Sequence, residues 1–251
     1  MTKILAIAGV TVRDALRQKL AVNLLVFALL VIGASQVLAE LTFGEQYRII
    51  ADLTLSAAGL FGTLIAVFLG ANLIAGDVQR RSLYPVLAKP VSRTQYVLGR
   101  YAGLLAVLLL NLAVMAATTI AVLGYYRRGF GFLTATPLLL AFAGLAAQLA
   151  MVAAIALVFS AFTNVTLAAI ATLALTAAGH SARVALPFWR TSALGRGLAM
   201  VVPDLAALDW KVAVVYSDHV ADAALTLGYA ALYTAAVLAL GSAIFARRDL
   251  R

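Results

Sequence analysis

Few side chains in this chain of 251 residues could perform catalysis or bind a metal. There is no cysteine, and the two histidines, His180 and His219, lie far apart in the sequence. A metal site on the outer face could use the two histidines with Asp218 or Asp222. Metal sites in proteins normally use three or four ligands, so this set is a disfavoured alternative. Ser181 follows His180 but lacks the Gly-x-Ser-x-Gly context of a nucleophilic serine. The sequence therefore predicts neither a catalytic site nor a metal site.

Nucleotide-binding motifs are also missing. The chain has no G-x-x-x-x-G-K-[ST] loop, in which backbone N–H groups and a lysine hold phosphates, and no H-E-x-x-H zinc motif. We therefore expect a non-catalytic protein that binds no ATP or other cofactor itself.

One polar segment is strongly basic and comprises residues 76–100, between two apolar runs. Its single acid is Asp77, and its bases are Arg80, Arg81, Lys89, Arg93 and Arg100. The Lys-Pro-Val-Ser-Arg run at residues 89–93 is expected to end one helix and start another, because the residue before a proline avoids the helical region. The apolar side chains of this segment could fill a groove on a partner protein. Alternatively, the arginines only fix the membrane orientation and contact lipid phosphates.

The composition is that of an integral membrane protein. Hydrophobic residues make up 64% of the chain and charged residues 12%, whereas soluble domains have about 45–50% and about 25%. The mean hydropathy is +1.02. The net charge of +9 is therefore better explained by basic residues at the cytoplasmic membrane face than by nucleic-acid binding.

The apolar pattern predicts a single all-α transmembrane domain over residues 1–251. Residues 2–19 have a basic and an apolar side at helical spacing, which indicates an amphipathic helix in the membrane interface. Six later runs are long enough to cross a bilayer as helices: about 20–39, 53–75, 101–124, 137–162, 165–186 and 223–246. In the second run, Gly59, Gly62 and Gly70 are expected to let helices pack closely.

Charge predicts how these spans are oriented. With six spans, both termini and the basic segment lie on one side, where twelve bases face three acids, while the other side has seven of each. Basic residues near span ends stay in the cytoplasm. We therefore expect a multi-pass protein of the cytoplasmic (inner) membrane, with both termini and residues 76–100 in the cytoplasm.

The longest segment between spans, residues 187–222, is expected on the outer side. It is interpreted as short amphipathic helices lying against the membrane, with Asp204 as a helix N-cap and the tryptophans at headgroup depth. His180, Ser181 and Arg183 are placed at the same outer interface. The other five spans have no ionisable residue in their middle thirds, which argues against an ion-driven secondary transporter.

The basic segment also resembles a known family. Its order of residues is an acid at Asp77, then Ser82-Leu83, then the Leu-x-x-Pro-Val-Ser-Arg core (Leu87, Pro90, Val91, Ser92 and Arg93), then Gly99-Arg100 before the next span. This resembles the first cytoplasmic loop of permease subunits of type-2 ABC transporters, an exporter family. The specific motif covers about 25 residues, while the layout of spans agrees over the whole chain. Arg81-Ser82 stands where Gly-Thr is commoner, and Arg100 replaces the usual lysine.

The resemblance implies how the protein would work. Two ATPase subunits would bind and hydrolyse ATP for two permease subunits. The loop between the second and third spans would form a coupling helix in a groove of the ATPase, and residues 160–166 would make a second, smaller contact. The interface residues implied in this way are Asp77, Arg80, Arg81, Leu83, Tyr84, Leu87, Pro90, Val91, Ser92, Arg93, Phe162, Thr163 and Asn164.

The sequence thus predicts a non-catalytic permease subunit that couples ATP hydrolysis by partner subunits to export of an unidentified cargo. Its expected partners are two ABC ATPase subunits, a second copy of itself or a paralogue, membrane lipids, and a periplasmic or extracellular partner at residues 187–222, but no nucleic acid. Two alternatives stay open: a secondary transporter or channel that works without a nucleotide, and a membrane assembly factor that acts through its outer segment.

Overall fold

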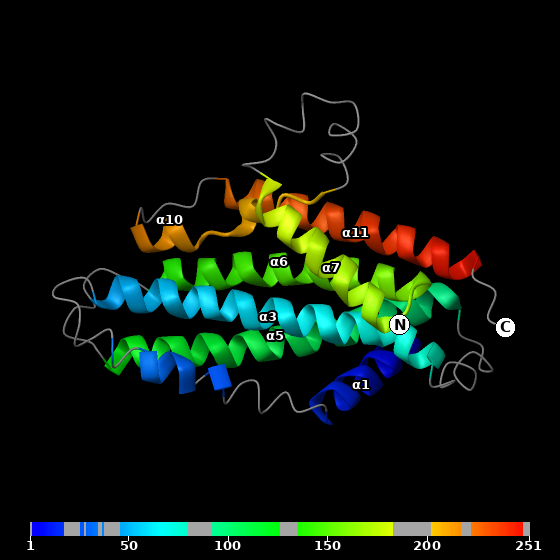
Figure 1. Cartoon of the computed structure of the whole chain (residues 1–251), viewed down its shortest axis with the longest axis horizontal. Helices are drawn as coiled ribbons and strands as arrows, with labels where there is room; N and C mark the ends of the chain where they lie inside the picture. The colour runs from blue at the N-terminus through cyan, green and yellow to red at the C-terminus, as the bar shows by residue number, and fades with distance from the viewer. Residues whose placement is uncertain are drawn as a thin grey trace.

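The computed structural model describes residues 2–17, 26–27, 29–34, 37, 46–79, 92–125, 135–182, 202–216 and 222–247, and all regular structure in them is helical (Figure 1). The helices are α1 (Thr2–Arg17), α3 (Gln46–Gln79), α5 (Arg93–Tyr125), α6 (Ala135–Phe162), α7 (Val165–His180), the short 3₁₀ helix η2 (Leu205–Leu208), α10 (Lys211–Tyr216) and α11 (Ala223–Arg247).

Four of the described helices are long and apolar enough to cross a membrane, namely α3, α5, α6 and α11. This confirms an all-helical, multi-pass membrane protein. Helix α7 is apolar but has 16 residues, fewer than the about 20 that a span needs. Of the first predicted span, residues 20–39, only 26–27, 29–34 and 37 are described, and they are helical.

Helices α3 and α5 continue beyond the apolar runs that predicted them. Helix α3 ends at Gln79 and α5 begins at Arg93, so both ends of the predicted loop at residues 76–100 are helical. Apolar length indicates how much helix the lipid covers, but a helix continues into water until a cap or a proline stops it. Ser92 is such a cap: its Oγ accepts from the Gln95 N–H, and Gln95 Oε1 accepts from the Ser92 N–H, both at 3.2 Å. This reciprocal pair is a capping box.

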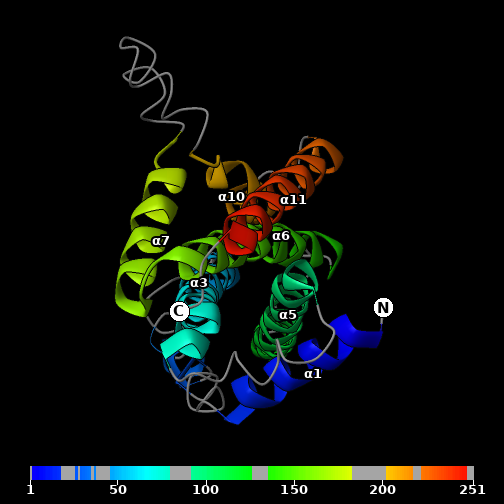
Figure 2. The ribbon, with the colours of Figure 1, turned by 90° about the vertical axis from the view of Figure 1, so that its right-hand side faces the viewer.

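Helix α6 is the centre of the bundle, with α11 on one side and α3 and α5 on the other (Figure 2). Small residues permit the close packing of α3 against α6: a Cβ on Gly62 would lie 2.7 Å from Leu149, and one on Gly70 would lie 2.6 Å from the Cβ of Ala156. In lipid, van der Waals packing of this kind holds helices together.

Helix α1 lies across the outside of α5 (Figure 2). Two glycines of α5, Gly99 and Gly103, form the contact, and a Cβ on Gly103 would lie 2.5 Å from the Thr11 side chain and 2.8 Å from the Ala8 carbonyl oxygen. The backbones of α1 and α5 therefore touch directly.

The described part of the outer segment packs into the bundle rather than on its surface. Residues Leu205, Leu208 and Val215 are fully buried, and Trp210 is 5% exposed; Trp210 lies against Gly144 of α6. The segment therefore packs against α3, α6 and α7 instead of lying only on the membrane surface, and the headgroup depth of Trp210 stays a prediction. Asp204 does cap η2, since its carboxylate accepts from the Ala207 N–H at 3.0 Å.

Candidate functional site

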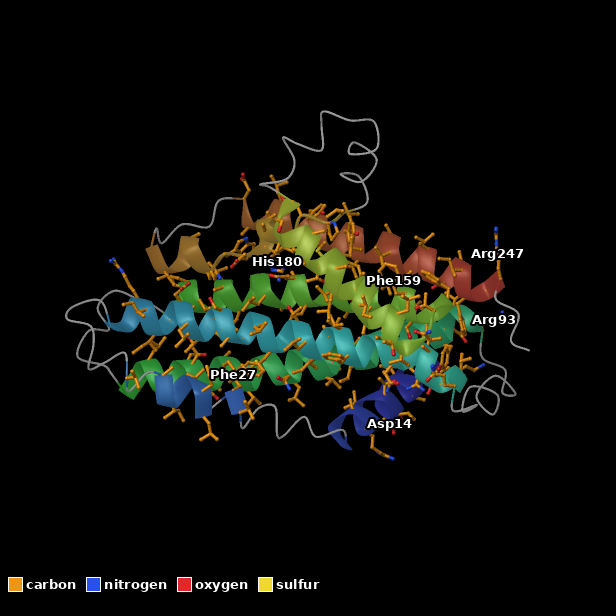
Figure 3. All side chains as sticks on the ribbon, viewed as in Figure 1. Asp14, Phe27, Arg93, Phe159, His180 and Arg247 are labelled. Atoms are coloured by element: carbon orange, nitrogen blue, oxygen red, sulfur yellow. The ribbon has the colours of Figure 1, made fainter. Side chains whose placement is uncertain are left out.

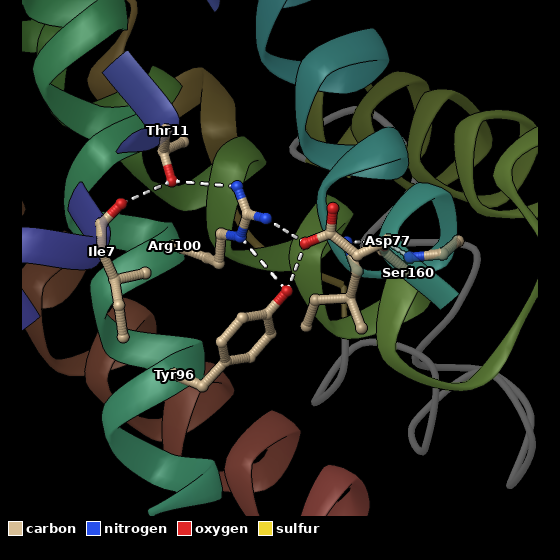
Figure 4. A network of polar contacts seen from close by, with 8 residues as sticks. Ile7, Thr11, Asp77, Tyr96, Arg100 and Ser160 are labelled. Atoms are coloured by element: carbon tan, nitrogen blue, oxygen red, sulfur yellow. Dashed lines mark hydrogen bonds and ion pairs between the residues drawn. The ribbon is translucent and has the colours of Figure 1, made fainter. Parts of the chain in front are cut away.

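A buried ion pair links the two helices that flank the basic segment. Arg100 of α5 donates through Nη2 to Oδ2 of Asp77, near the end of α3 (Figure 4). The Arg100 and Asp77 side chains are 11% and 17% exposed. Asp77 precedes residues 80–91 and Arg100 follows them. The pair therefore joins α3 to α5 across the two ends of these residues, which carry most of the motif that resembles the permease loop.

Two hydroxyl groups complete this arrangement. Tyr96 donates its phenol proton to the same Asp77 oxygen and accepts from Arg100 Nε at 3.2 Å. On the other side of the guanidinium, Arg100 Nη1 donates to Thr11 Oγ1 at 3.2 Å, and Thr11 donates to the Ile7 carbonyl at 3.1 Å (Figure 4). We call Thr11, Asp77, Tyr96 and Arg100 the Asp77–Arg100 network. It joins α1, α3 and α5.

Removing one member of the ion pair should be costly. A buried charge that loses its partner keeps its desolvation penalty, and breaking such pairs typically costs about 3–5 kcal/mol. The network therefore specifies how α3 and α5 are placed relative to each other, more than it adds net stability.

Ser160 of α6 connects to α3 in a different way. Its hydroxyl donates to the Ala71 carbonyl at 2.8 Å and accepts from the Ala75 N–H at 2.8 Å and the Ile74 N–H at 3.0 Å. Ala75 N–H and Ala71 C=O are an i, i−4 pair of α3, so the fully buried hydroxyl is bonded to both groups of one helical backbone pair. Helix α6 is thereby hydrogen bonded to the backbone of α3 within two turns before Asp77.

Arg93, at the start of α5, holds the end of α11. Its Nη1 donates to the carbonyls of Phe245 at 3.1 Å and Ala246 at 3.0 Å. The last carbonyls of a helix have no partner within the helix, and a cation at that end is favourable. The rings of Tyr96 and Phe245 also stack, with centroids 5.8 Å apart.

The turn between α6 and α7 is held by its own side chains. Thr163 Oγ1 donates to the Phe159 carbonyl at 2.7 Å, and Asn164 caps α7 by accepting from the Leu167 N–H at 2.8 Å. Phe162 is 45% exposed. The turn is therefore ordered and presents an aromatic side chain, two residues after Ser160.

The structure describes six of the residues expected at an ATPase interface, and they come from the same end of the bundle, where α3 and α6 end and α5 and α7 begin (Figure 1). These are Asp77, Ser92, Arg93, Phe162, Thr163 and Asn164. Arg80, Arg81, Leu83, Tyr84, Leu87, Pro90 and Val91 lie outside the described residues, and their role stays a prediction. His219 and Asp218 also lie outside them, and Asp222 is a described residue of the turn before α11.

The sequence interpretation missed Thr11, Tyr96 and Ser160. Tyr96 had a weak signal, since it precedes Arg100 by four residues and such pairs share a helix face. Thr11 and Ser160 are ordinary hydroxyl residues in apolar helices, and only their neighbours reveal what they do. Arg100 was noted in the motif but was interpreted as a residue that fixes orientation.

Comparison with known families identifies what this chain is. Residues 5–179 match the family model described as ABC-2 family transporter protein. The chain belongs to this family. The matched region includes α1, α3, α5, α6 and most of α7, and therefore the Asp77–Arg100 network and the basic segment.

Membership makes this protein the membrane permease of an ABC transporter, a class that works with an ATPase subunit. A search of curated proteins found no match. Helices η2, α10 and α11 lie beyond the matched region.

Proposed function

We propose that this ABC-2 permease is the transmembrane subunit of an exporter and that separate ATPase subunits drive it by ATP hydrolysis. The energy enters through residues 80–91 and the turn at residues 162–164. The Asp77–Arg100 network is the observation that carries the proposal, because it ties both helices beside the basic segment to each other and to α1. A force on that segment therefore reaches α1, α3 and α5 together.

Two further connections support this transmission. Ser160 bonds α6 to α3, and Arg93 bonds α5 to the end of α11. The two predicted ATPase contacts, residues 80–91 and the turn at residues 162–164, are thus joined through these hydrogen bonds, since the turn begins two residues after Ser160. We call this set of bonded helix ends the connected layer. A closing partner could move such a layer as a lever, which is how lid and switch motions transmit ligand binding.

The proposed topology has six spans, with residues 20–39 and 165–186 as the first and fifth. It places both termini and the connected layer in the cytoplasm, at the cytoplasmic (inner) membrane. The charge distribution supports this orientation, because twelve of the nineteen basic residues would lie on the cytoplasmic side.

The permease is proposed to work as a dimer, with a second copy or a paralogue. Helices α3 and α7 lie side by side (Figure 2), and both carry exposed apolar side chains: Phe68, Leu167 and Ile170. In oligomeric membrane proteins such faces pack against a partner, and a two-fold pair is the commonest arrangement.

One observation favours a second candidate, a transporter that needs no nucleotide. His180 contacts Gln148 in the middle of α6, so an ionisable side chain lies part-way along the bundle. Ionisable groups at such depth often mark ion or proton pathways. His180 is exposed on one side and no chain of ionisable groups is seen beyond it in the described residues, so the exporter remains the proposal.

Recruitment of an ATPase tests the proposal. The permease is co-expressed with the ABC ATPase encoded beside it, purified in detergent and assayed for bound ATPase and for hydrolysis. We expect a stable complex with the wild type, less hydrolysis coupled to the permease in Asp77→Lys and in Arg100→Asp, and recovery in the double swap. Arg13→Ala, at an exposed position of α1, is the matched control. A wild type that never recruits the ATPase would refute the exporter and favour the second candidate.

A further inference from the structure

A second polar site lies far from the Asp77–Arg100 network. A pocket of about 330 Å³ is bounded by α3, α6, α7 and residues 209 and 211. Gln148, in its wall, is near the middle of α6, about 20 Å from either end at 1.5 Å per residue. Figure 3 places His180, another wall residue, well away from the end marked by Arg93 and Arg247. The pocket therefore lies part-way along the bundle, away from that end.

The polar groups of the pocket are placed by hydrogen bonds. The amide nitrogen of Gln148, which is 2% exposed, lies 2.9 Å from His180 Nε2, and His180 Nδ1 lies 3.0 Å from the Thr176 carbonyl. A carbonyl only accepts, so Nδ1 donates to it. The Gln148 amide and the Thr176 backbone therefore hold the imidazole in place in the pocket wall.

Thr176 has a buried hydroxyl without a hydrogen-bond partner. It is 4% exposed, and its Oγ1 makes no hydrogen bond to any described residue. One turn earlier, Thr172 satisfies its hydroxyl by donating to the Ala168 carbonyl at 2.6 Å. Thr176 is also one of the residues that line the pocket. An unpaired buried hydroxyl is costly, so a ligand that bonds it gains affinity.

The charges of the pocket cancel. Lys211 Nζ lies 3.7 Å from Asp209 Oδ2 and donates to Ser56 Oγ at 3.1 Å. Asp209 and Lys211 are the charged residues of its wall, one of each sign, so their charges cancel. A head group with a net charge would attract one of these two ions and repel the other, whereas a head with no net charge meets no net repulsion.

The rest of the wall is apolar and open on one side. Leu55 of α3 and Leu145 of α6 line the pocket. Leu60 and Leu173 line its open side, and these two side chains are 61% and 36% exposed. A polar interior with an apolar opening suits a molecule that has a polar head and an apolar tail, and mostly apolar walls with a few polar groups are typical of ligand sites.

We propose that this pocket binds an amphiphile whose polar head has no net charge, with the head beside Gln148, Thr176 and the Asp209–Lys211 pair and the tail toward Leu60 and Leu173. Its role as the cargo site rests on the proposed export function, but binding itself needs no ATPase.

Lipid retention measures this binding. The permease is titrated in detergent with three lipids that share the same acyl chains, and is then released from the micelles in a mass spectrometer, which counts the bound lipids. The lipids are phosphatidylcholine, which is zwitterionic, phosphatidylglycerol, which is anionic, and a diacyl trimethylammonium-propane, which is cationic. We expect phosphatidylcholine to bind about threefold to tenfold more tightly than either charged lipid. This range corresponds to the free energy of one or two net hydrogen bonds. Equal binding of the three, or tighter binding of a charged lipid, would overturn the proposal.

Substitutions locate the site. Thr176→Val should weaken phosphatidylcholine binding about threefold without lowering the melting temperature, whereas Thr172→Val, on the same helix, should leave binding unchanged. Asp209→Asn should shift the preference toward phosphatidylglycerol, and Lys211→Met toward the cationic lipid. A phosphatidylcholine preference that persists in both charge variants would show that the lipid binds elsewhere and refute the site.

The two proposals fail separately. If no ATPase is recruited but lipid selectivity follows Asp209 and Lys211, the exporter is wrong and the binding site stands. If the ATPase is recruited and coupled but the three lipids bind alike, the site is wrong and the exporter stands.

Discussion

At the scale of single residues, the described chain uses its buried polar groups to connect helices. Arg100 has three hydrogen-bond partners: Asp77 and Thr11, which belong to two other helices, and Tyr96, which belongs to the same helix. Ser160 does the same with backbone groups only. In a membrane, a polar group without such partners is expensive, so these contacts define which helix positions face each other.

The first prediction concerns the Asp77–Arg100 ion pair. Asp77→Ala and Arg100→Ala should each destabilise the protein by about 3–5 kcal/mol, because each removes the opposite charge from a largely buried ion, and the double variant should lose less than the sum. The free energy of unfolding in detergent measures this. The partly exposed Asp209–Lys211 pair serves as the comparison. The corresponding two single variants and double variant of this pair should give an interaction energy of about 1 kcal/mol or less. Additive losses at Asp77 and Arg100 would contradict a direct pair.

The second prediction concerns Ser160. Ser160→Ala removes three hydrogen bonds to α3 and should cost about 1–3 kcal/mol, since the Ala75 N–H and Ala71 carbonyl can pair with each other only in part. The melting temperature of the purified permease measures it. Thr118→Val, which removes an exposed hydroxyl bonded within α5, should stay within about 0.5 kcal/mol. Equal effects of the two substitutions would show that the link between α6 and α3 is energetically unimportant.

At the scale of elements, caps and glycines determine where helices start and how closely they approach. The capping box of Ser92 and Gln95 sets the start of α5, and Gly99 and Gly103 let α1 lie on that helix. Both features come directly after the predicted coupling segment, so its position follows from local backbone chemistry as well as from the bundle.

The third prediction separates two roles of Ser92. If Ser92 acts as a cap, Ser92→Ala should cost about 1 kcal/mol of stability, and Ser92→Asp should retain it, because aspartate is also a good cap. If Ser92 instead contacts the ATPase, both substitutions should reduce recruitment of the ATPase to a similar extent. Thermal unfolding and co-purification of the same variants distinguish the roles.

The fourth prediction concerns the docking of α1. Gly103→Val should push α1 away from α5, because the new side chain would overlap Thr11 and the Ala8 carbonyl. The chain has no cysteine, so a cysteine in place of Ala15, which is 4% exposed, reports the change as faster maleimide labelling. Gly124→Val is the matched control, since nothing lies within 4 Å of a Cβ at Gly124. Equal labelling rates would mean that α1 does not depend on this contact.

At the scale of the whole molecule, the bundle is uneven. The spanning window of α6 is 67% buried, whereas that of α11 is 11% buried, so α6 is the core and α11 is attached to one side. The exposed apolar faces of α3 and α7 lie together (Figure 2). A second copy there would cover apolar side chains that the single chain leaves open.

The fifth prediction tests that arrangement. A cysteine in place of Phe68, which is 57% exposed on α3, should form a disulfide-linked dimer in membranes on mild oxidation. A cysteine in place of Leu232, which is 75% exposed on α11, should not. Non-reducing gel electrophoresis measures both. Dimers from Leu232→Cys alone would place the partner on α11 instead.

Much of this architecture could be predicted from the sequence, because lipid imposes a simple rule on helix length and composition. Apolar runs identified the helices, and alternating directions brought Asp77, Arg93 and Phe162 to one end. The contact of Thr11 with Arg100 could not be predicted, since it depends on where α1 docks. The contact of Gln148 with His180 joins α6 to the end of α7, and the contact of Trp210 with Gly144 joins the outer segment to α6. Both depend on how the elements pack, which a pattern of apolar residues does not specify.

The position of α11 in the chain has a consequence for how the protein is made. Helix α11 follows the other described helices, so it leaves the ribosome after them. Its partners belong to those earlier helices: Val158 of α6, against which Gly241 fits closely, and Arg93 of α5, which donates to its last carbonyls. We therefore expect α11 to complete the bundle last, by covering one side of α6.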